Sequence, residues 1–162
     1  MNLVIRQASI NDLERISQIE KICFPNAEAA TKRSLEERIK AFKESFFVGE
    51  INGEVIGFIN GAVIDSKTIF DELYENINRH NQNGKYQSVF GLDVIPEFRN
   101  RGIAESLMNH MINSAKKYNR EGVVLTCKDK LIHYYEKFGF NNMGISESAH
   151  GNVIWYDMFL EF

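Results

Sequence analysis

The sequence predicts a single α/β domain over residues 1–162, with a mixed central sheet that is antiparallel at its start, parallel in its centre and flanked by helices. Two observations predict this fold. Asn52-Gly53 separates two apolar runs, which is the strongest short-range signal for a β-hairpin. Later, a strand at 88–95, an amphipathic helix at 101–118 and a strand at 122–126 form a βαβ unit. Its right-handed crossover makes the two strands parallel.

The N-terminal part is expected to form a short strand and two helices. Ser9 is placed to cap a first helix whose apolar stripe ends near Cys23. The loop Phe24–Ala30 separates this helix from a second amphipathic helix. Ser34 and Glu37 form a candidate capping box for that second helix.

The middle of the chain should hold the hairpin and a polar insertion. The hairpin strands are expected at 46–51 and 55–59, with the second continuing to about Ile64. The insertion, residues 66–85, has apolar side chains at roughly helical spacing and ends in a cluster of turn residues.

The C-terminal part is expected to complete the sheet. A short helix at 130–138 ends at Gly139, and two closing strands fit 140–145 and 152–160. No repeat, linker or low-complexity tract interrupts this order, which favours one core.

Composition indicates an ordinary soluble protein. The chain has 162 residues, 44% hydrophobic and 25% charged, and its net charge of -3 gives no reason to expect nucleic acid or an anionic membrane as partner. Cys23 and Cys127 lie in apolar stretches, which is typical of reduced, buried thiols, and the four histidines are scattered. No stretch resembles a targeting or membrane-spanning segment. We therefore expect a cytoplasmic protein without a disulfide or a structural metal.

The stretch from Leu92 to Glu105 predicts a phosphate-binding helix start. Pro96 ends the strand, and Gly102 precedes the long helix, whose first amides have no partner within the helix. The spacing is neither that of a dinucleotide fingerprint nor that of a P-loop. A surface loop with two solvated arginines is therefore an equal alternative on these residues alone.

Two motifs resemble one family. The run Arg99-Asn100-Arg101-Gly102-Ile103-Ala104 is similar to the acetyl-CoA motif Arg/Gln-x-x-Gly-x-Gly/Ala of the GCN5-related N-acetyltransferases, or GNAT enzymes. The run Tyr134-Tyr135-Glu136-Lys137-Phe138-Gly139-Phe140 resembles their Phe-Tyr-x-x-x-Gly-Phe element. The resemblance implies a GNAT fold with splayed parallel strands, and direct transfer of acetyl from acetyl-CoA to a primary amine.

The resemblance also implies where acetyl-CoA binds. The segment Leu92, Asp93 and Val94 would form part of the cofactor site, with backbone groups of Leu92 and Val94 holding the pantetheine. The pyrophosphate would lie beside Arg99 on amides at the helix start, from Asn100, Arg101, Gly102, Ile103, Ala104 and Glu105.

Two residues are candidate catalytic groups. Tyr135 occupies the tyrosine position of the family element, which implies a general acid for the CoA thiolate; an aromatic packing role is the alternative, and the preferred one for Tyr134. An alkylamine is almost fully protonated at pH 7, so a base is useful. Glu28, in the loop between the first two helices, is the leading candidate, with a solvated loop carboxylate as the alternative.

Other polar residues are weaker candidates. Glu20 is expected to be an exposed helix charge, although it could neutralise a cationic acceptor. His133 and His150 are secondary candidates for a proton relay. Cys127 is expected to be buried rather than nucleophilic, because no histidine is placed to activate it.

A narrower resemblance is to the arylalkylamine, or serotonin-type, branch. Segments 20–30, 66–85 and 127–135 carry it. That branch has two histidines on the strand before the CoA loop, and Ser88 and Phe90 stand in their places, so its relay is absent. We expect a small-molecule amine acceptor, with arylalkylamines as the candidate class, and a monomer or homodimer. The alternatives are a protein or peptide acceptor and a non-catalytic acyl-CoA-binding regulatory module.

Overall fold

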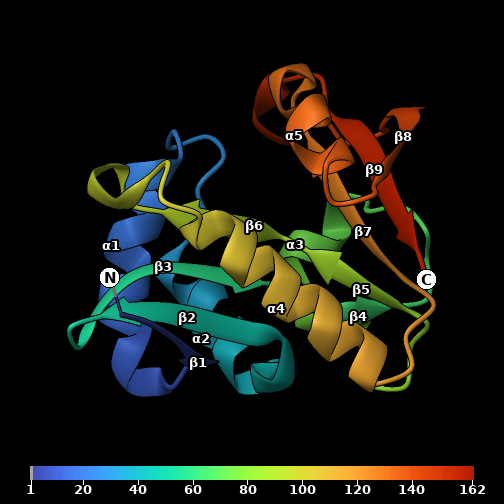
Figure 1. Cartoon of the computed structure of the whole chain (residues 1–162). Helices are drawn as coiled ribbons and strands as arrows, with labels where there is room; N and C mark the ends of the chain where they lie inside the picture. The colour runs from blue at the N-terminus through green and yellow to red at the C-terminus, as the bar shows by residue number, and fades with distance from the viewer. Residues whose placement is uncertain (1) are drawn as a thin grey trace.

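Two β-sheets form the centre of the molecule. The structure is a computed structural model that describes residues 2–162. The first sheet is antiparallel and contains, in spatial order, β1 (Leu3–Gln7), β2 (Phe46–Ile51), β3 (Glu54–Asn60) and β6 (Gly91–Val94). The second sheet contains, in spatial order, β4 (Val63–Ile64), β5 (Tyr86–Val89), β7 (Gly122–Cys127), β9 (Tyr156–Glu161) and β8 (Asn141–Ile145). Among residues 2–162, only β5 and β7 pair in parallel, which confirms the predicted βαβ unit (Figure 1).

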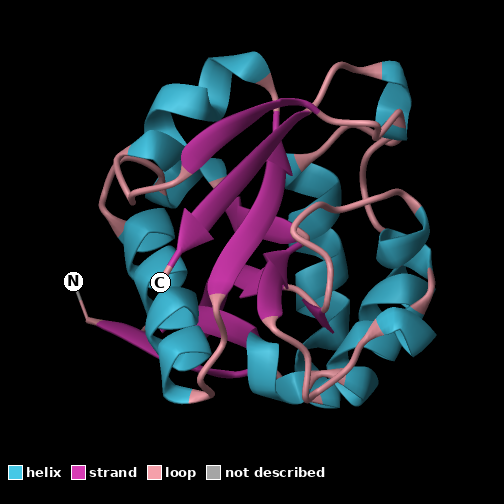
Figure 2. Ribbon diagram, turned by 90° about the vertical axis from the view of Figure 1, so that its right-hand side faces the viewer, coloured by secondary structure: helices cyan, strands magenta, loops and turns pink. Residues whose placement is uncertain are grey.

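Helices cover the sheets on both sides (Figure 2). They are α1 (Leu13–Cys23), α2 (Lys32–Ala41), α3 (Glu72–Glu75), α4 (Ile103–Lys117) and α5 (Ile132–Glu136). In Figure 1, α4 crosses in front of the first sheet, while α1 and α2 lie behind it. Helices α1 and α4 both contact β3 and β6, so β6 is packed from its two faces. The mixed sheet with flanking helices confirms the predicted fold class.

The predicted hairpin is confirmed, but its second strand is shorter than expected. Asn52 and Gly53 have φ values of 53° and 79°, as a two-residue hairpin turn of the favoured type requires. Strand β3 ends at Asn60, and β4 then joins the other sheet. Gly61 makes this change of sheet possible, because a side chain there would collide with the carbonyl oxygen of Ser88.

Three other boundaries differ from the prediction. The cap of α2 is Thr31, whose Oγ1 accepts from the Ser34 amide at 3.1 Å, so Ser34 lies inside the helix. The insertion contains the short α3 and one further helical turn at Ile77–Arg79, and its buried apolar side chains include Ile69, before α3, and Leu73, within it. The last strand begins at Tyr156, because Gly151 and Asn152 adopt positive φ in a preceding turn.

The predicted strand at 88–95 is broken at Phe90, and this break creates the open edge. Strand β5 belongs to the second sheet and β6 to the first, where β6 pairs with β3 and with no other strand of the described residues. The Ile95 amide donates to the Ile56 carbonyl at 3.0 Å, and hydrogen-bonded positions alternate along an antiparallel pair. The backbone groups of Leu92 and Val94 therefore face away from β3, toward β7.

The cysteines are free thiols. Cys127 is buried as predicted, but Cys23, at the end of α1 and over the Val94 carbonyl, is only partly buried. Within residues 2–162, no helix is both long and apolar enough to cross a membrane. Over the same range, no group of three or more His, Cys, Asp or Glu side chains is arranged to hold a metal ion.

Candidate active site

Helix α4 starts beside the open edge of β6. Gly102 precedes it in the left-handed conformation with φ of 79°, and the first backbone bond of the helix runs from the Ser106 amide to the Gly102 carbonyl at 3.0 Å. The amides of Ile103, Ala104 and Glu105 are thus not used within the helix. Together with the positive end of the helix dipole, they form a cradle suited to a phosphate group.

The two arginines of the motif have different surroundings. Arg99 Nε donates to the Val94 carbonyl at 2.8 Å, and its Nη2 lies 3.6 Å from Cys23 Sγ. Its side chain therefore fastens the loop to the end of α1. Arg101 is exposed and stacks on Phe98, with its Cζ 5.2 Å from the ring centroid, so its charge faces solvent near the helix start.

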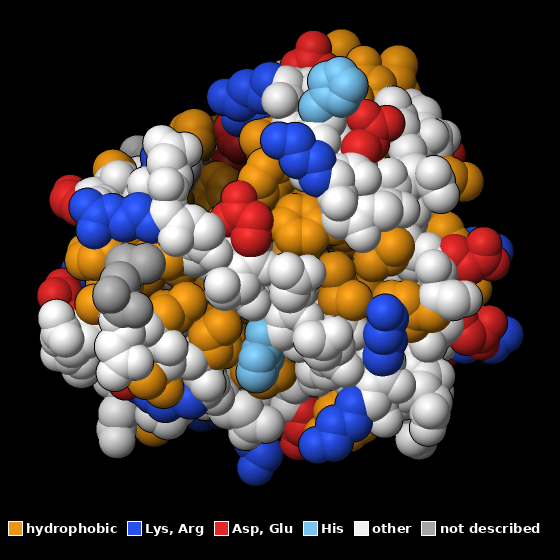
Figure 3. Space-filling view, viewed as in Figure 1, with side chains coloured by type: hydrophobic (Ala, Val, Ile, Leu, Met, Phe, Trp, Pro, Cys, Tyr) orange, Lys and Arg blue, Asp and Glu red, His pale blue; other side chains and the backbone are white. Residues whose placement is uncertain are grey.

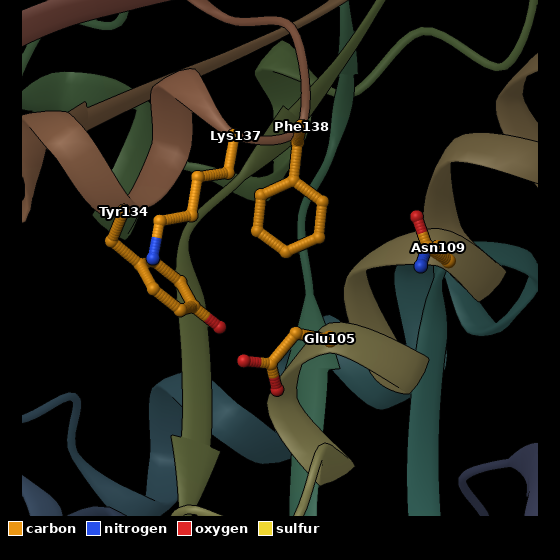
Figure 4. A pocket seen from close by; sticks show the side chains of 5 residues that line it. All are labelled: Glu105, Asn109, Tyr134, Lys137 and Phe138. Atoms are coloured by element: carbon orange, nitrogen blue, oxygen red, sulfur yellow. The ribbon is translucent and has the colours of Figure 1, made fainter.

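A pocket of about 330 Å³ lies between α4 and α5. Figure 4 shows the side chains around it, which come from α4, from α5 and from the turn that follows α5: Glu105, Asn109, Tyr134, Lys137 and Phe138. Only Glu105 was named for cofactor binding by sequence reasoning. Spacing could have indicated the others, because residues three and four apart share one helix face. Asn109 lies four residues after Glu105, and Lys137 and Phe138 lie three and four residues after Tyr134. Figure 3 also shows a recess with hydrophobic side chains below the lobe that carries α5.

The two tyrosines of α5 lie in different environments. Burial raises the pKa of the Tyr135 hydroxyl above its ordinary value, and the neighbouring Tyr134, Cys127 and Asp93 raise it further. Tyr135 therefore stays protonated at neutral pH. The Tyr134 hydroxyl is buried with no hydrogen-bond partner among residues 2–162, and burial raises its pKa to about 12, with Glu105 adding to the effect. Tyr134 thus lines the pocket as well as packing edge-on against the Phe138 ring.

Cys127 is not suited to nucleophilic catalysis. Burial raises the pKa of its thiol to about 11, and Asp129 raises it further, so the thiolate is scarce at neutral pH. This agrees with the prediction that Cys127 is buried rather than nucleophilic.

The loop 24–30 meets the loop before β9, residues 146–155, and also contacts Lys128, the residue after β7. Lys128 Nζ lies 3.0 Å from the Glu28 carboxylate in a largely buried ion pair. His150 Nε2 lies 2.9 Å from the Glu28 carbonyl oxygen. A Cβ on Gly151 would lie 2.8 Å from Glu28 Cγ, so the two loops are in contact.

The insertion, residues 66–85, contacts the loop before β9. Ser148 Oγ donates to the Asp71 carboxylate, and the Ala149 amide donates to Asp71 Oδ2 at 3.2 Å. The hydroxyls of Tyr74 and Thr126 are 2.9 Å apart. The loop 24–30, the insertion and the loop before β9 therefore contact one another and the end of β7. Together these contacts form the closure of the three segments.

The two positions of the missing histidines and the two candidate relay histidines have different surroundings. Ser88 is buried and donates to the Ala62 carbonyl at 2.7 Å, while Phe90 packs against aromatic side chains. His133 is on the surface of α5, with its side chain 99% exposed. His150 alone lies within the closure described above.

The expectation that Glu20 is an exposed charge is wrong. Its exposed fraction is 6%, and Oε2 accepts from the Ala30 amide at 2.8 Å. Glu20 follows Ile16 by four residues, so it shares the buried face of α1. It faces Asp93, whose exposed fraction is 1%.

Comparison with known proteins decides the family. The model of the acetyltransferase (GNAT) family matches residues 13–140. The chain belongs to the GNAT family. This GNAT domain is therefore an N-acetyltransferase with acetyl-CoA as its co-substrate, as the motifs predict.

Relatives of this GNAT domain carry several names. An N-alpha-acetyltransferase of Sulfurisphaera tokodaii is 26% identical over 87% of this chain and 81% of that protein. Serotonin N-acetyltransferase of Mesocricetus auratus is 28% identical over 65% of this chain and 50% of that protein. The probable hydrolase YhcX of Bacillus subtilis is 25% identical over 82% of this chain, which spans 27% of that protein.

A solved structure shows the same fold. The GphF GNAT-like decarboxylase in complex with isobutyryl-CoA has a TM-score of 0.85 with 18% sequence identity, covering 98% of each chain. At this identity the likeness concerns the fold alone.

Proposed function

We propose that this GNAT domain acetylates the primary amine of a small molecule, with arylalkylamines as the acceptor class. The observation that carries the proposal is the contact between the loop 24–30 and the loop before β9. An extended peptide needs a path about as wide as one strand, roughly 5 Å between neighbouring backbones. The 2.9 Å contact between His150 Nε2 and the Glu28 carbonyl closes that path.

Aromatic side chains at the closure favour an aromatic acceptor. The Tyr74 ring stacks on His150 with centroids 5.5 Å apart and lies 5.0 Å from Phe90. Trp155 follows at 6.3 Å from His150. Such rings offer faces and edges to a flat ligand. The similarity to hamster serotonin N-acetyltransferase supports the same class, whereas the archaeal N-alpha-acetyltransferases favour a peptide N-terminus as the second candidate.

Each part of the site would have one task in the reaction. The amides of Ile103, Ala104 and Glu105 hold the pyrophosphate, and the outer edge of β6 holds the pantetheine by backbone hydrogen bonds. Acetyl-CoA supplies the activated acyl group as a thioester. Tyr135 donates a proton to the departing thiolate, which its raised pKa allows because the hydroxyl is protonated before the reaction.

We assign Glu28 a positioning role instead of the predicted proton transfer. Its carboxylate already binds Lys128 Nζ at 3.0 Å, and its backbone carbonyl faces His150. Both contacts hold the Glu28 side chain and backbone in place between the two loops. Glu28 therefore holds the acceptor loop closed.

The acceptor class is tested by thiol release from acetyl-CoA with three kinds of amine: phenethylamine and tryptamine, spermidine, and short peptides with free N-termini. We expect turnover with the arylalkylamines and at least about 100-fold lower kcat/KM with peptides, a difference of about 3 kcal/mol in transition-state binding. Turnover of peptides alone contradicts the proposal. Binding of acetyl-CoA without turnover of any amine identifies a regulatory module.

A loop variant makes the test sharper. Lys128→Met removes the ion pair with Glu28 and loosens the closure, so we expect peptide acetylation to rise relative to that of phenethylamine. Lys130→Met, nearby and exposed, is the matched control and should leave the ratio unchanged. An equal ratio in all three proteins contradicts the role of the closure.

A further inference from the structure

Two buried carboxyl groups face each other between α1 and β6. Glu20 comes from α1 and Asp93 from β6. A Cβ on Gly91 would lie 3.2 Å from Asp93 Oδ1, 3.4 Å from Asn60 Nδ2 and 4.0 Å from Glu20 Oε1. Three polar side chains thus converge on a point where the chain has no side chain of its own.

Asp93 has no partner for its charge within hydrogen-bonding distance. Both carboxyl oxygens are buried, and neither accepts a hydrogen bond from an N–H or hydroxyl donor among residues 2–162. An isolated ionised carboxylate in such a place is costly. Burial raises the pKa of Asp93 well above its ordinary value, followed by the charge of Glu20 and by hydrogen bonding with the Glu20 carboxyl group; Cys23 adds to this, and Arg38 opposes it.

Arg38 supplies one positive charge to this cluster. Its guanidinium is buried, donating from Nη1 to Asn60 Oδ1 at 3.1 Å and from Nη2 to the Tyr74 carbonyl at 2.9 Å. Two carboxyl groups that share one proton carry one negative charge. With that proton the cluster is neutral, and without it the cluster has a net negative charge that attracts an ammonium group.

The cluster is connected to the acceptor loop and to the proposed general acid. Glu20 Oε2 accepts from the Ala30 amide, which ties the pair to the acceptor loop 24–30. The charge of Asp93 is one of the effects that raise the pKa of Tyr135. The pair is therefore within electrostatic reach of the proposed general acid.

We propose that the Asp93–Glu20 pair takes the proton that the acceptor ammonium must lose before it attacks the thioester. This inference rests on the proposed function. It supplies a proton acceptor in a chain where Ser88 and Phe90 stand in the places of the two relay histidines of the arylalkylamine branch. With its shared proton gone, the pair accepts a proton from the ammonium group at Asp93. The neutral nitrogen then forms a bond to the acetyl carbon.

The remaining proton transfers return Tyr135 and the pair to their starting states. The carbon–sulfur bond breaks as the adduct collapses, and Tyr135 gives its proton to the thiolate. The nitrogen loses its second proton, which restores Tyr135, while the first proton leaves the pair to solvent. A raised pKa at Asp93 suits this task, because it narrows the gap to an amine pKa of about 10.

The first test needs no acceptor. The Asp93 carboxyl is titrated in the ligand-free protein by infrared difference spectroscopy, with Asp93→Asn used to assign its band. We expect titration well above pH 4, and a shift to lower pH in Glu20→Gln, because that change removes a neighbouring negative charge. Glu14→Gln, on the exposed face of α1, is the matched control and should cause no shift. Ordinary titration of Asp93, or no shift in Glu20→Gln, overturns the pairing.

The second test uses phenethylamine and its β-fluoro and β,β-difluoro analogues, whose amine pKa values fall in that order. We expect Asp93→Asn to lower kcat/KM by about 100-fold or more with phenethylamine and by progressively less along the series. We expect the acidic limb of the kcat/KM profile to move to lower pH in Glu20→Gln. An equal loss for all three amines, with an unchanged acetyl-CoA Kd, overturns the role as proton acceptor.

The two proposals fail in different ways. If the wild-type protein acetylates none of the three amines, the proposed acceptor class is wrong. The infrared titration still decides whether the Asp93–Glu20 pair exists as described.

Discussion

Replacing Tyr135 with phenylalanine lowers kcat by about 100-fold or more while the Kd for acetyl-CoA changes by no more than about twofold. The substitution removes a proton donor and keeps the ring that packs against Phe140 with centroids 6.0 Å apart. Without the donor, the CoA thiolate must leave with its full negative charge in a buried place, which raises the barrier. Steady-state kinetics and calorimetric titration of acetyl-CoA measure the two quantities separately.

Tyr134→Phe is the matched control for this experiment. Both hydroxyls belong to α5, but that of Tyr134 faces the pocket beside Glu105 (Figure 4). We expect this variant to lower kcat by less than about tenfold, because the Tyr134 hydroxyl makes no hydrogen bond among residues 2–162 that the substitution could remove. An unchanged kcat in Tyr135→Phe removes Tyr135 from the mechanism, and a large loss in Tyr134→Phe assigns the proton donor to that residue.

Replacing Gly102 with valine weakens acetyl-CoA binding by about 100-fold, which corresponds to about 3 kcal/mol. Gly102 has a φ of 79°, which a β-branched residue adopts only with strain, and its missing side chain leaves open space in front of the helix amides. A valine would occupy the space where the phosphate approaches and turn the amides away from it. Calorimetric titration with acetyl-CoA measures the loss.

Gly53→Val is the control that separates the effect of backbone strain from the loss of acetyl-CoA binding. Gly53 also has a φ of 79°, lies in the β2–β3 turn, and has open space within 4 Å of the position that a Cβ would take. Both variants should lose stability by a similar amount, about 1–3 kcal/mol, in thermal unfolding. We expect only Gly102→Val to lose affinity for acetyl-CoA. Equal affinities in the two variants contradict the phosphate site.

Local sequence patterns predict much of this fold but not where a strand changes sheet. The turn at Asn52-Gly53 and the βαβ unit depend on nearby residues, and both are confirmed. The breaks at Gly61 and Phe90 depend on how two distant strands meet. Apolar runs continue through both positions, so periodicity indicates longer strands than the structure has.

The same distinction holds for the candidate site. The helix start at Gly102 is a local motif and lies where the sequence predicts it. The burial of Glu20 and Asp93 depends on the packing of α1 against β6, segments far apart in the sequence, and a charged residue on a helix is more often exposed. The pocket residues Asn109, on α4, and Lys137, directly after α5, likewise line one pocket only because the fold brings these two segments near each other.

Residue-resolved amide hydrogen exchange, measured by NMR with and without acetyl-CoA, tests most directly whether the cofactor binds along the open edge of β6 and the start of α4. We predict slower exchange on binding at Leu92 and Val94, whose amides face that edge, and at Ile103–Glu105. Amides of the β1–β2 pair, remote from the gap, should be unaffected. Slower exchange elsewhere with no change at Leu92, Val94 and the helix start would contradict this binding mode.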